Sequence, residues 1–146
     1  MNIIKMMPEH YRKVYELWIS CKGMGLNNLD DSEHGINKFL ERNPDTCFVA
    51  LEDDLIVGAI IAGSDGRRGY IYHTAVNPSY RKRGIATALV ESVMTAMKNI
   101  GINKVALVAF ERNINGNRFW EKLGFTERND LVYRNRAINK MIRNDT

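Results

Sequence analysis

The chain places three basic residues and a glycine, Arg81, Lys82, Arg83 and Gly84, directly before a stretch with helical periodicity. The first turn of a helix has backbone N–H groups without partners and a partial positive charge, so it attracts phosphate. Gly84 has no side chain to hold an anion away, and Ala86 has only a methyl group. We therefore predict that this turn binds a diphosphate. The predicted contacts come from Arg81, Arg83, Gly84, Ile85, Ala86 and Thr87.

A strand and a helix are expected to position this turn. Residues 70–76 are rich in the β-branched and aromatic types that favour strands, and Pro78 cannot donate to a sheet ladder. From Ile85 onward the apolar residues recur at helical spacing, and Gly101 stands where a left-handed C-cap belongs. The order strand, turn, helix sets the N-terminus of the helix beside the end of the strand.

Sequence motifs narrow the kind of diphosphate. The chain has no G-x-x-x-x-G-K-[ST] segment and no G-x-G-x-x-G segment, so neither a nucleotide P-loop nor a dinucleotide fingerprint is supported. The turn instead has the form Arg-x-x-Gly-x-Ala. It resembles the acetyl-CoA-binding motif R/Q-x-x-G-x-G/A of the GCN5-related N-acetyltransferase (GNAT) superfamily.

Residues 113–125 support the same resemblance. They predict a helix with Asn113 as its N-cap and Gly124 as its C′ residue. The segment is similar to the superfamily pattern N-x-x-A-x-x-x-Y-x-x-x-G-F, in which the Asn contacts the pantetheine arm. Gly116 stands at the small position, whereas Trp120 replaces the Tyr that is a frequent general acid. The resemblance implies that Asn113 and Trp120 line the cofactor.

The resemblance covers about residues 49–133 and implies one domain with the α/β acyl-CoA N-acyltransferase fold. This fold has a mixed central sheet of six or seven strands with helices on both faces. Its fourth and fifth strands, here residues 70–77 and 104–109, splay apart at one end. The pantetheine would enter this gap and bond to main-chain groups of Ala75 and Val76.

The implied reaction is direct attack of a primary amine on acetyl-CoA, as co-substrate and without a metal. Orientation and an N–H near Val76 that polarises the carbonyl would supply most of the acceleration. The indole of Trp120 is a poor acid, but a thiolate with a pKa of about 8.5, by analogy with free cysteine, can leave without full protonation. The acceptor would be a small amine, or the N-terminus or a lysine of a protein.

Tyr72 and His73 are the catalytic candidates, as the titratable side chains within the strand that precedes the turn. Strand alternation puts them on opposite faces, so at most one is expected to face the acceptor. Packing or surface roles for both remain open, and a bound water or a backbone carbonyl could act as the base instead.

Further elements complete the expected domain. Residues 21–31 form a polar loop that is a candidate for shaping the acceptor site, and the glycine-rich residues 63–69 read as a hairpin connection. The other expected elements are a strand at residues 2–5, a helix opened by Pro8, a helix at 32–42 with Ser32 as N-cap, and strands at 46–51, 55–62 and 104–109.

Composition indicates an ordinary globular protein of 146 residues, with 45% hydrophobic and 26% charged residues. Cys21 and Cys47 have no paired spacing and are expected to be reduced, while the three histidines form no metal-ligand pattern. No apolar run is long enough to span a bilayer. We expect a cytoplasmic protein, and a homodimer remains open.

Two other function classes remain open. The replacement at Trp120 allows an acyl-CoA sensor of the same fold that has lost catalysis. The net charge of +4 allows a nucleic-acid-binding protein, although no recognition motif supports one. A basic tail is the main observation for that class, and its residues are Arg134, Arg136, Lys140 and Arg143.

Overall fold

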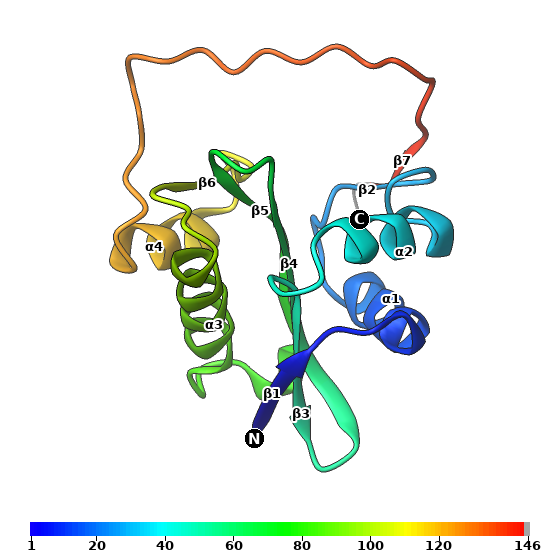
Figure 1. The fold of residues 1–146 in the computed structure, drawn as a ribbon. Helices are drawn as coiled ribbons and strands as arrows, with labels where there is room; N and C mark the ends of the chain where they lie inside the picture. Colours follow the sequence, from blue (N-terminus) through cyan, green and yellow to red (C-terminus); the bar gives the residue numbers. More distant parts are fainter. Residues whose placement is uncertain (145–146) are drawn as a thin grey trace.

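Five strands form the central sheet of the protein, whose computed structural model describes residues 1–144 (Figure 1). In spatial order they are β1 (Asn2–Lys5), β3 (Phe48–Glu52), β4 (Leu55–Ser64), β5 (Gly69–Val76) and β6 (Val105–Leu107). Neighbours from β1 to β5 run antiparallel, whereas β5 and β6 are parallel. The sheet is therefore mixed, and the parallel pair needs the helical crossover that follows β5.

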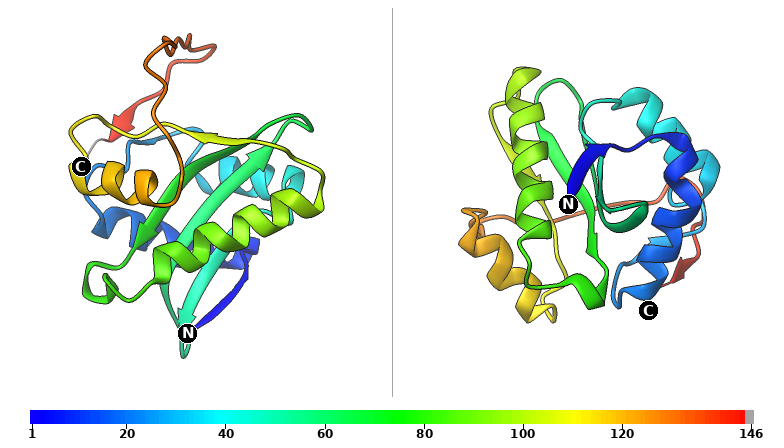
Figure 2. Two further views of the ribbon diagram at one scale, coloured as in Figure 1. Left: turned by 90° about the vertical axis from the view of Figure 1, so that its left-hand side faces the viewer. Right: turned by 90° about the horizontal axis from the view of Figure 1, so that it is seen from below.

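Helices cover both faces of this sheet (Figure 1, Figure 2). On one face lie α1 (Tyr11–Ser20), which follows a 3-10 turn at Pro8–His10, and α2 (Glu33–Arg42). On the other lie α3 (Ile85–Asn99), which follows a 3-10 turn at Pro78–Tyr80, and α4 (Ile114–Lys122). No helix within residues 1–144 has the length and apolar composition needed to cross a membrane.

Each pair of helices encloses an apolar core against the sheet. Trp18 of α1 is fully buried in the first core, which includes Ala75 of β5. Leu89 and Val93 of α3 are fully buried in the second. Burial of each such aliphatic side chain contributes about 2 kcal/mol. The packing fixes α3 on the sheet, so the place of its N-terminus beside the end of β5 is fixed as well.

Local signals at the helix ends are confirmed. The Ser32 hydroxyl accepts a hydrogen bond from the Gly35 N–H (3.0 Å) as the N-cap of α2. Gly101 and Gly124 follow the ends of α3 and α4 with φ of 83° and 90°. Their left-handed backbone is the one a helix stop favours, and glycine adopts it without a Cβ clash.

The central sheet has five strands among the described residues, rather than the six or seven predicted. The two further strands, β2 (Leu26–Asn27) and β7 (Arg143–Asn144), pair with each other instead. Residues 126–142, here called the strap, form no strand and arch from α4 across to β7 (Figure 1). Apolar residues in the strap do not alternate with polar ones over a whole strand length, so no face of it can be buried on the sheet.

A β-bulge in β5 corrects the prediction that Tyr72 and His73 lie on opposite faces. Ile61 pairs with His73, but the next residue, Ala62, pairs with Ile71, so Tyr72 is an extra residue in the ladder. The extra residue resets the alternation, as bulges do. As a result, Tyr72 contacts α2 and His73 contacts α1, and both face the same side of the sheet.

Cys47 gives a test of the first core. Its thiol is buried, with Sγ 3.4 Å from the Ala62 carbonyl oxygen, and burial raises the pKa of this thiol to about 12. Because the thiolate is the reactive form, we expect iodoacetamide at pH 8 to modify Cys47 only after unfolding. Mass spectrometry of a Cys21→Ser variant, with and without urea, measures this. Rapid modification of the folded variant would contradict the packing.

Candidate active site

The turn before α3 leaves backbone amides free. Gly84 is the N-cap with φ 80°, and no side chain caps the helix. The first helical bond runs from the Ala88 N–H to the Gly84 carbonyl (3.0 Å). Within residues 1–144, the N–H groups of Ile85, Ala86 and Thr87 therefore have no partner. These are the donors that an anion at a helix N-terminus uses, so the predicted diphosphate site is open.

The side chains of Arg81 and Arg83 point in different directions from the turn. The Arg83 guanidinium lies over the Tyr80 ring, 4.8 Å from its centroid, with Nη2 3.5 Å from the Ser79 carbonyl oxygen, and Arg83 directly precedes the Gly84 N-cap. Arg81 turns back toward the strand, with Nε 3.4 Å from the Val76 carbonyl oxygen and Nη2 3.8 Å from the Cys21 sulfur. Arg83 is therefore the better placed of the two for a phosphate.

Gly58 of β4 allows α3 to approach the sheet at this point. A Cβ added at Gly58 would lie 3.0 Å from the side chains of both Ile85 and Leu89, closer than packed carbon atoms allow. These two residues are buried in the first turns of α3. The close approach brings the free amides down to the level of the end of β5.

The open edge of β5 begins where β6 ends. The parallel pairs run from Gly69–Val105 to Ile71–Leu107, and within the described residues β5 then continues to Val76 without a partner strand on that side. The Asn77 N–H donates to Val57 of β4 (2.8 Å). Since main-chain groups alternate in an antiparallel ladder, the Val76 N–H points away from β4. The predicted splay between these strands is confirmed.

α4 borders this opening with the two residues of the second motif. The Asn113 side-chain oxygen accepts from the Gly116 N–H (3.0 Å) and caps the helix. A Cβ at Gly116 would collide with the Asn113 amide, which explains glycine at the small position. Trp120 is partly buried between Phe119 and Phe125, with ring centroids 5.0 and 5.3 Å away.

On the opposite face, His73 contacts a residue that the sequence did not indicate. Its Nε2 lies 2.8 Å from a carboxylate oxygen of Asp31, which is 42 positions away in the chain. The second oxygen of Asp31 accepts from the Asn27 N–H (2.8 Å). The only sequence signal for Asp31 was its place in the polar loop 21–31, and nothing local links it to His73.

Comparison with known proteins identifies the family. The sequence model described as Acetyltransferase (GNAT) family matches residues 11–125. The chain belongs to the GNAT family of acetyltransferases. An acetyltransferase of Photorhabdus laumondii is 32% identical over 140 residues, which cover 94% of this chain and 96% of the relative.

Solved structures show the same GNAT fold. The aminoglycoside N-acetyltransferase AAC(6')-Iy, in complex with a CoA-containing bisubstrate analogue, has a TM-score of 0.70 and 23% identity over 93% of this chain and 98% of its own. A ribosomal-protein-alanine N-acetyltransferase from Brucella melitensis has a TM-score of 0.70 and 20% identity over the same shares. The predicted fold class and the assignment as an acetyltransferase are confirmed.

Tyr72, the extra residue of the bulge, is 54% exposed on the face of the sheet that carries α1 and α2. Its ring lies 5.6 Å from that of Phe39 and 4.7 Å from that of Tyr70. Burial raises the pKa of the Tyr72 phenol above its ordinary value, and Tyr133 and Asp30 raise it further. The phenol is therefore protonated at neutral pH, where it can donate a hydrogen bond but cannot take a proton from a substrate.

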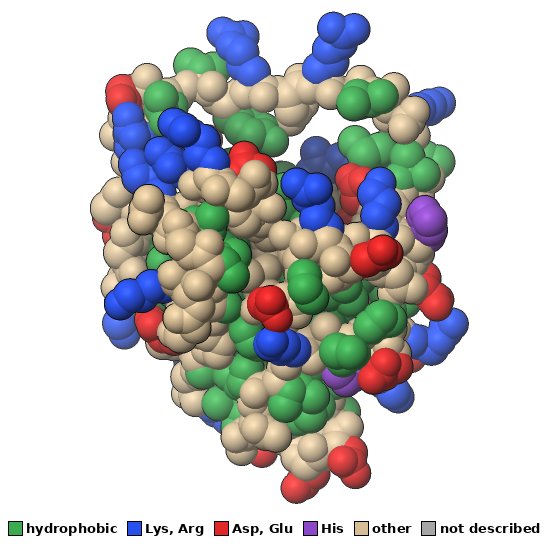
Figure 3. Space-filling model, in the orientation of Figure 1, with side chains coloured by type: hydrophobic (Ala, Val, Ile, Leu, Met, Phe, Trp, Pro, Cys, Tyr) green, Lys and Arg blue, Asp and Glu red, His purple; other side chains and the backbone are tan. Residues whose placement is uncertain are grey.

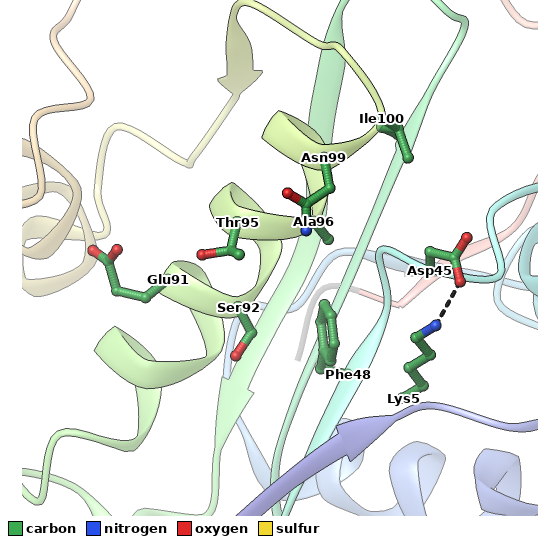
Figure 4. Close-up of a pocket in the computed structure, with 9 residues that line it drawn as sticks. All are labelled: Lys5, Asp45, Phe48, Glu91, Ser92, Thr95, Ala96, Asn99 and Ile100. Atoms are coloured by element: carbon green, nitrogen blue, oxygen red, sulfur yellow. Dashed lines mark hydrogen bonds and ion pairs between the residues drawn. The ribbon is translucent and has the colours of Figure 1, made fainter.

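Two other surface features lie outside the GNAT motifs. A groove between α3 and strands β1 and β3 is lined by Phe48, Glu91 and Thr95, with the Lys5–Asp45 ion pair (2.6 Å) at one side (Figure 4). It contains none of the predicted site residues. Lys and Arg side chains project from the strap into solvent (Figure 3), as expected for a solvated face of the basic tail.

Gly35 gives a test of how the Asp31 loop is positioned. A Cβ at Gly35 would collide with the carbonyl oxygens of Leu29 and Asp30, which are backbone atoms and cannot move aside cheaply. We expect Gly35→Ala to lower the free energy of unfolding by about 1–3 kcal/mol, although alanine is the better helix former. Urea denaturation measures this, with His34→Ala, exposed in the same turn, as the control. Equal stability of Gly35→Ala and the parent would refute the loop packing.

Proposed function

We propose that this protein transfers the acetyl group of acetyl-CoA to a primary amine. The observation that carries the proposal is the row of unpartnered amides at Ile85, Ala86 and Thr87, beside the open edge of β5. The free amides suit the diphosphate of CoA, and the open edge of β5 suits an extended, amide-containing arm. The CoA complexes of AAC(6')-Iy, which shares the fold, support this use of the site.

The cofactor contacts follow from the geometry of the turn and the strand. The amides at the start of α3 hold the diphosphate, and Arg83 adds a positive charge beside them. Arg81 supports the end of β5 through the Val76 carbonyl. Ala75 stands opposite Ala59 in the ladder, so its main-chain groups serve β4, and the free N–H of Val76 is assigned to the thioester arm.

The chemical step is direct transfer between the two bound substrates. The amine nitrogen attacks the thioester carbonyl carbon, and the Val76 N–H stabilises the negative charge that develops on the oxygen. The C–S bond then breaks, the CoA thiolate leaves, and the nitrogen loses its proton to a base. Trp120 donates no proton and serves as a wall of the thioester pocket, which a thiolate leaving group tolerates.

The acceptor reaches the thioester from the face that carries α1 and α2. AAC(6')-Iy is named for aminoglycosides and the Brucella enzyme for the alanine of a ribosomal protein, so the shared fold serves both small amines and peptide N-termini. Loop 21–31, β5 and the strap surround this face, and Tyr133 of the strap interacts with Tyr70 and Tyr72. We assign the choice of acceptor to these segments.

Charge reversal at the turn tests cofactor binding. We expect Gly84→Glu and Arg83→Glu each to weaken CoA binding by about ten- to hundredfold, the equivalent of one lost charge-assisted hydrogen bond or more. Isothermal titration measures the affinity. Lys98→Glu, the same reversal of charge at an exposed site near the other end of α3, is the matched control. The proposal would be contradicted if the parent protein did not bind CoA, or if all variants bound it equally well.

A thiol-release screen tests catalysis. With acetyl-CoA and a panel of amines and peptides, we expect the parent protein to release CoA with at least one acceptor. An absent general acid lowers the rate by about 10²–10⁴-fold, so turnover is slow but measurable. The parent could instead bind CoA and be inactive with every acceptor, while a Trp120→Tyr variant turns over. That result would identify the parent as an acyl-CoA sensor.

A further inference from the structure

Asp31 and His73 form a hydrogen-bonded pair in the wall of the acceptor face. The Asp31 carboxylate and the His73 Nε2 are 2.8 Å apart, and the two side chains are only 5% and 13% exposed. A carboxylate removed from water needs compensating hydrogen bonds, and Asp31 has them. The pair is therefore a fixed part of the acceptor face and not a solvent-exposed contact.

The Asp31 carboxylate is fixed from several directions. One oxygen bonds to His73, and the other accepts from the Asn27 N–H (2.8 Å). The Tyr11 hydroxyl of α1 donates to the Asp31 main-chain carbonyl (2.8 Å). The absence of a side chain at Gly35 lets the preceding backbone pack directly on α2. The Asp31 carboxylate therefore cannot move with the imidazole of His73. It holds the ring in one orientation instead.

The His73 ring keeps its other nitrogen available. Trp18 packs edge-on against the ring at 5.0 Å between centroids. Nδ1 has no hydrogen-bond partner within residues 1–144, and it is not among the buried unpaired atoms, so it reaches solvent. The hydrogen bond of one imidazole nitrogen fixes which nitrogen carries the proton. With Nε2–H donating to Asp31, Nδ1 carries the lone pair.

We propose that Asp31 is a positioning residue that holds His73 as the base for the acceptor amine. This inference rests on the proposed acetyl transfer. Nδ1 takes a proton from the acceptor ammonium, directly or through one water, and leaves a neutral amine. The amine lone pair forms the new C–N bond, the C–S bond breaks, and the thiolate of CoA leaves. The second proton of the nitrogen then passes to the thiolate, so the products are the amide, CoA as its thiol, and the proton held by His73.

Other groups near the pair do not compete for this role. The nearby titratable groups are Tyr11 of α1 with Glu33 beyond it, and Asp30 and Tyr72 beside the loop and the strand. The pKa values of the Tyr11 and Tyr72 phenols are raised, chiefly by burial, so both are protonated at neutral pH. His73 lies three positions before Val76 on β5, about 10 Å along the strand, with its ring against Trp18 of α1.

Imidazole ¹⁵N NMR of the acceptor-free protein gives the first test. We expect the uncharged imidazole of His73 to carry its proton on Nε2 and to have a bare Nδ1 in the parent, and to be a mixture of both tautomers in Asp31→Asn. In that variant two N–H donors, from Asn27 and His73, compete for a single amide oxygen. A parent with Nδ1 protonated, or a tautomer unchanged in Asp31→Asn, would overturn the proposal.

Kinetics with the acceptor found by the thiol-release screen gives the second test. We expect His73→Gln, which retains a donor for Asp31, to lower kcat/KM by about 10²-fold. Asp31→Asn should lower kcat by about tenfold, because the imidazole is no longer held in one tautomer. CoA affinity by titration should stay unchanged in both, and Asp54→Asn, an exposed carboxylate in the turn between β3 and β4, is the matched control.

The outcomes separate this inference from the proposed function. Normal kcat and kcat/KM in His73→Gln and Asp31→Asn, with CoA binding intact, would overturn the role of the pair alone. If the parent binds no CoA, the acetyl transfer and the role of the pair fall together. Thermal denaturation of each variant shows whether it folds, and the NMR result of the parent stands regardless of how the variants fold.

Discussion

Unpaired backbone amides are the constraint on which this site depends. In most of a folded chain the N–H groups are satisfied within helices and sheets, because a buried orphan donor is costly. Here β6 ends while β5 continues to Val76, and the next helix begins at Ile85 without a cap. Two sets of donors are therefore left at one place on the sheet. The core under α3 keeps them there, because the helix cannot tilt to close the gap without losing buried contacts at Leu89 and Val93.

The β-bulge determines which side chains of β5 project toward α1 and α2. In a regular strand, Tyr72 and His73 would project to opposite faces, and one of them would enter the core under α3. The extra residue at Tyr72 puts both on the side of α1 and α2 instead. A bulge also bends its strand and increases the local twist. The same irregularity therefore accompanies the point where β5 diverges from β6 and the point where the acceptor face acquires its titratable groups.

Local chemistry made much of this fold predictable. β5 ends just before Pro78, and α2 and α4 have Ser32 and Asn113 as their N-caps. Gly101 and Gly124 adopt the left-handed backbone after the ends of α3 and α4. Each signal acts within a few residues of the element it limits. The pairing of Asp31 with His73, the register shift in β5 and the path of the strap depend on contacts between distant segments. These contacts are set by segments far apart in the chain, so local sequence periodicity does not predict them.

The replacement at Trp120 shifts the burden of proton transfer to the acceptor side. A thiolate is a good enough leaving group to depart without an acid, so the loss of a phenol on α4 is tolerable. An amine has no such freedom, since its protonated form has no lone pair with which to attack. The indole packs between Phe119 and Phe125 and supports the wall of the opening. Removal of a proton, rather than its donation, is therefore the step for which we propose a protein group, and His73, hydrogen-bonded to Asp31, is the side chain that we propose for it.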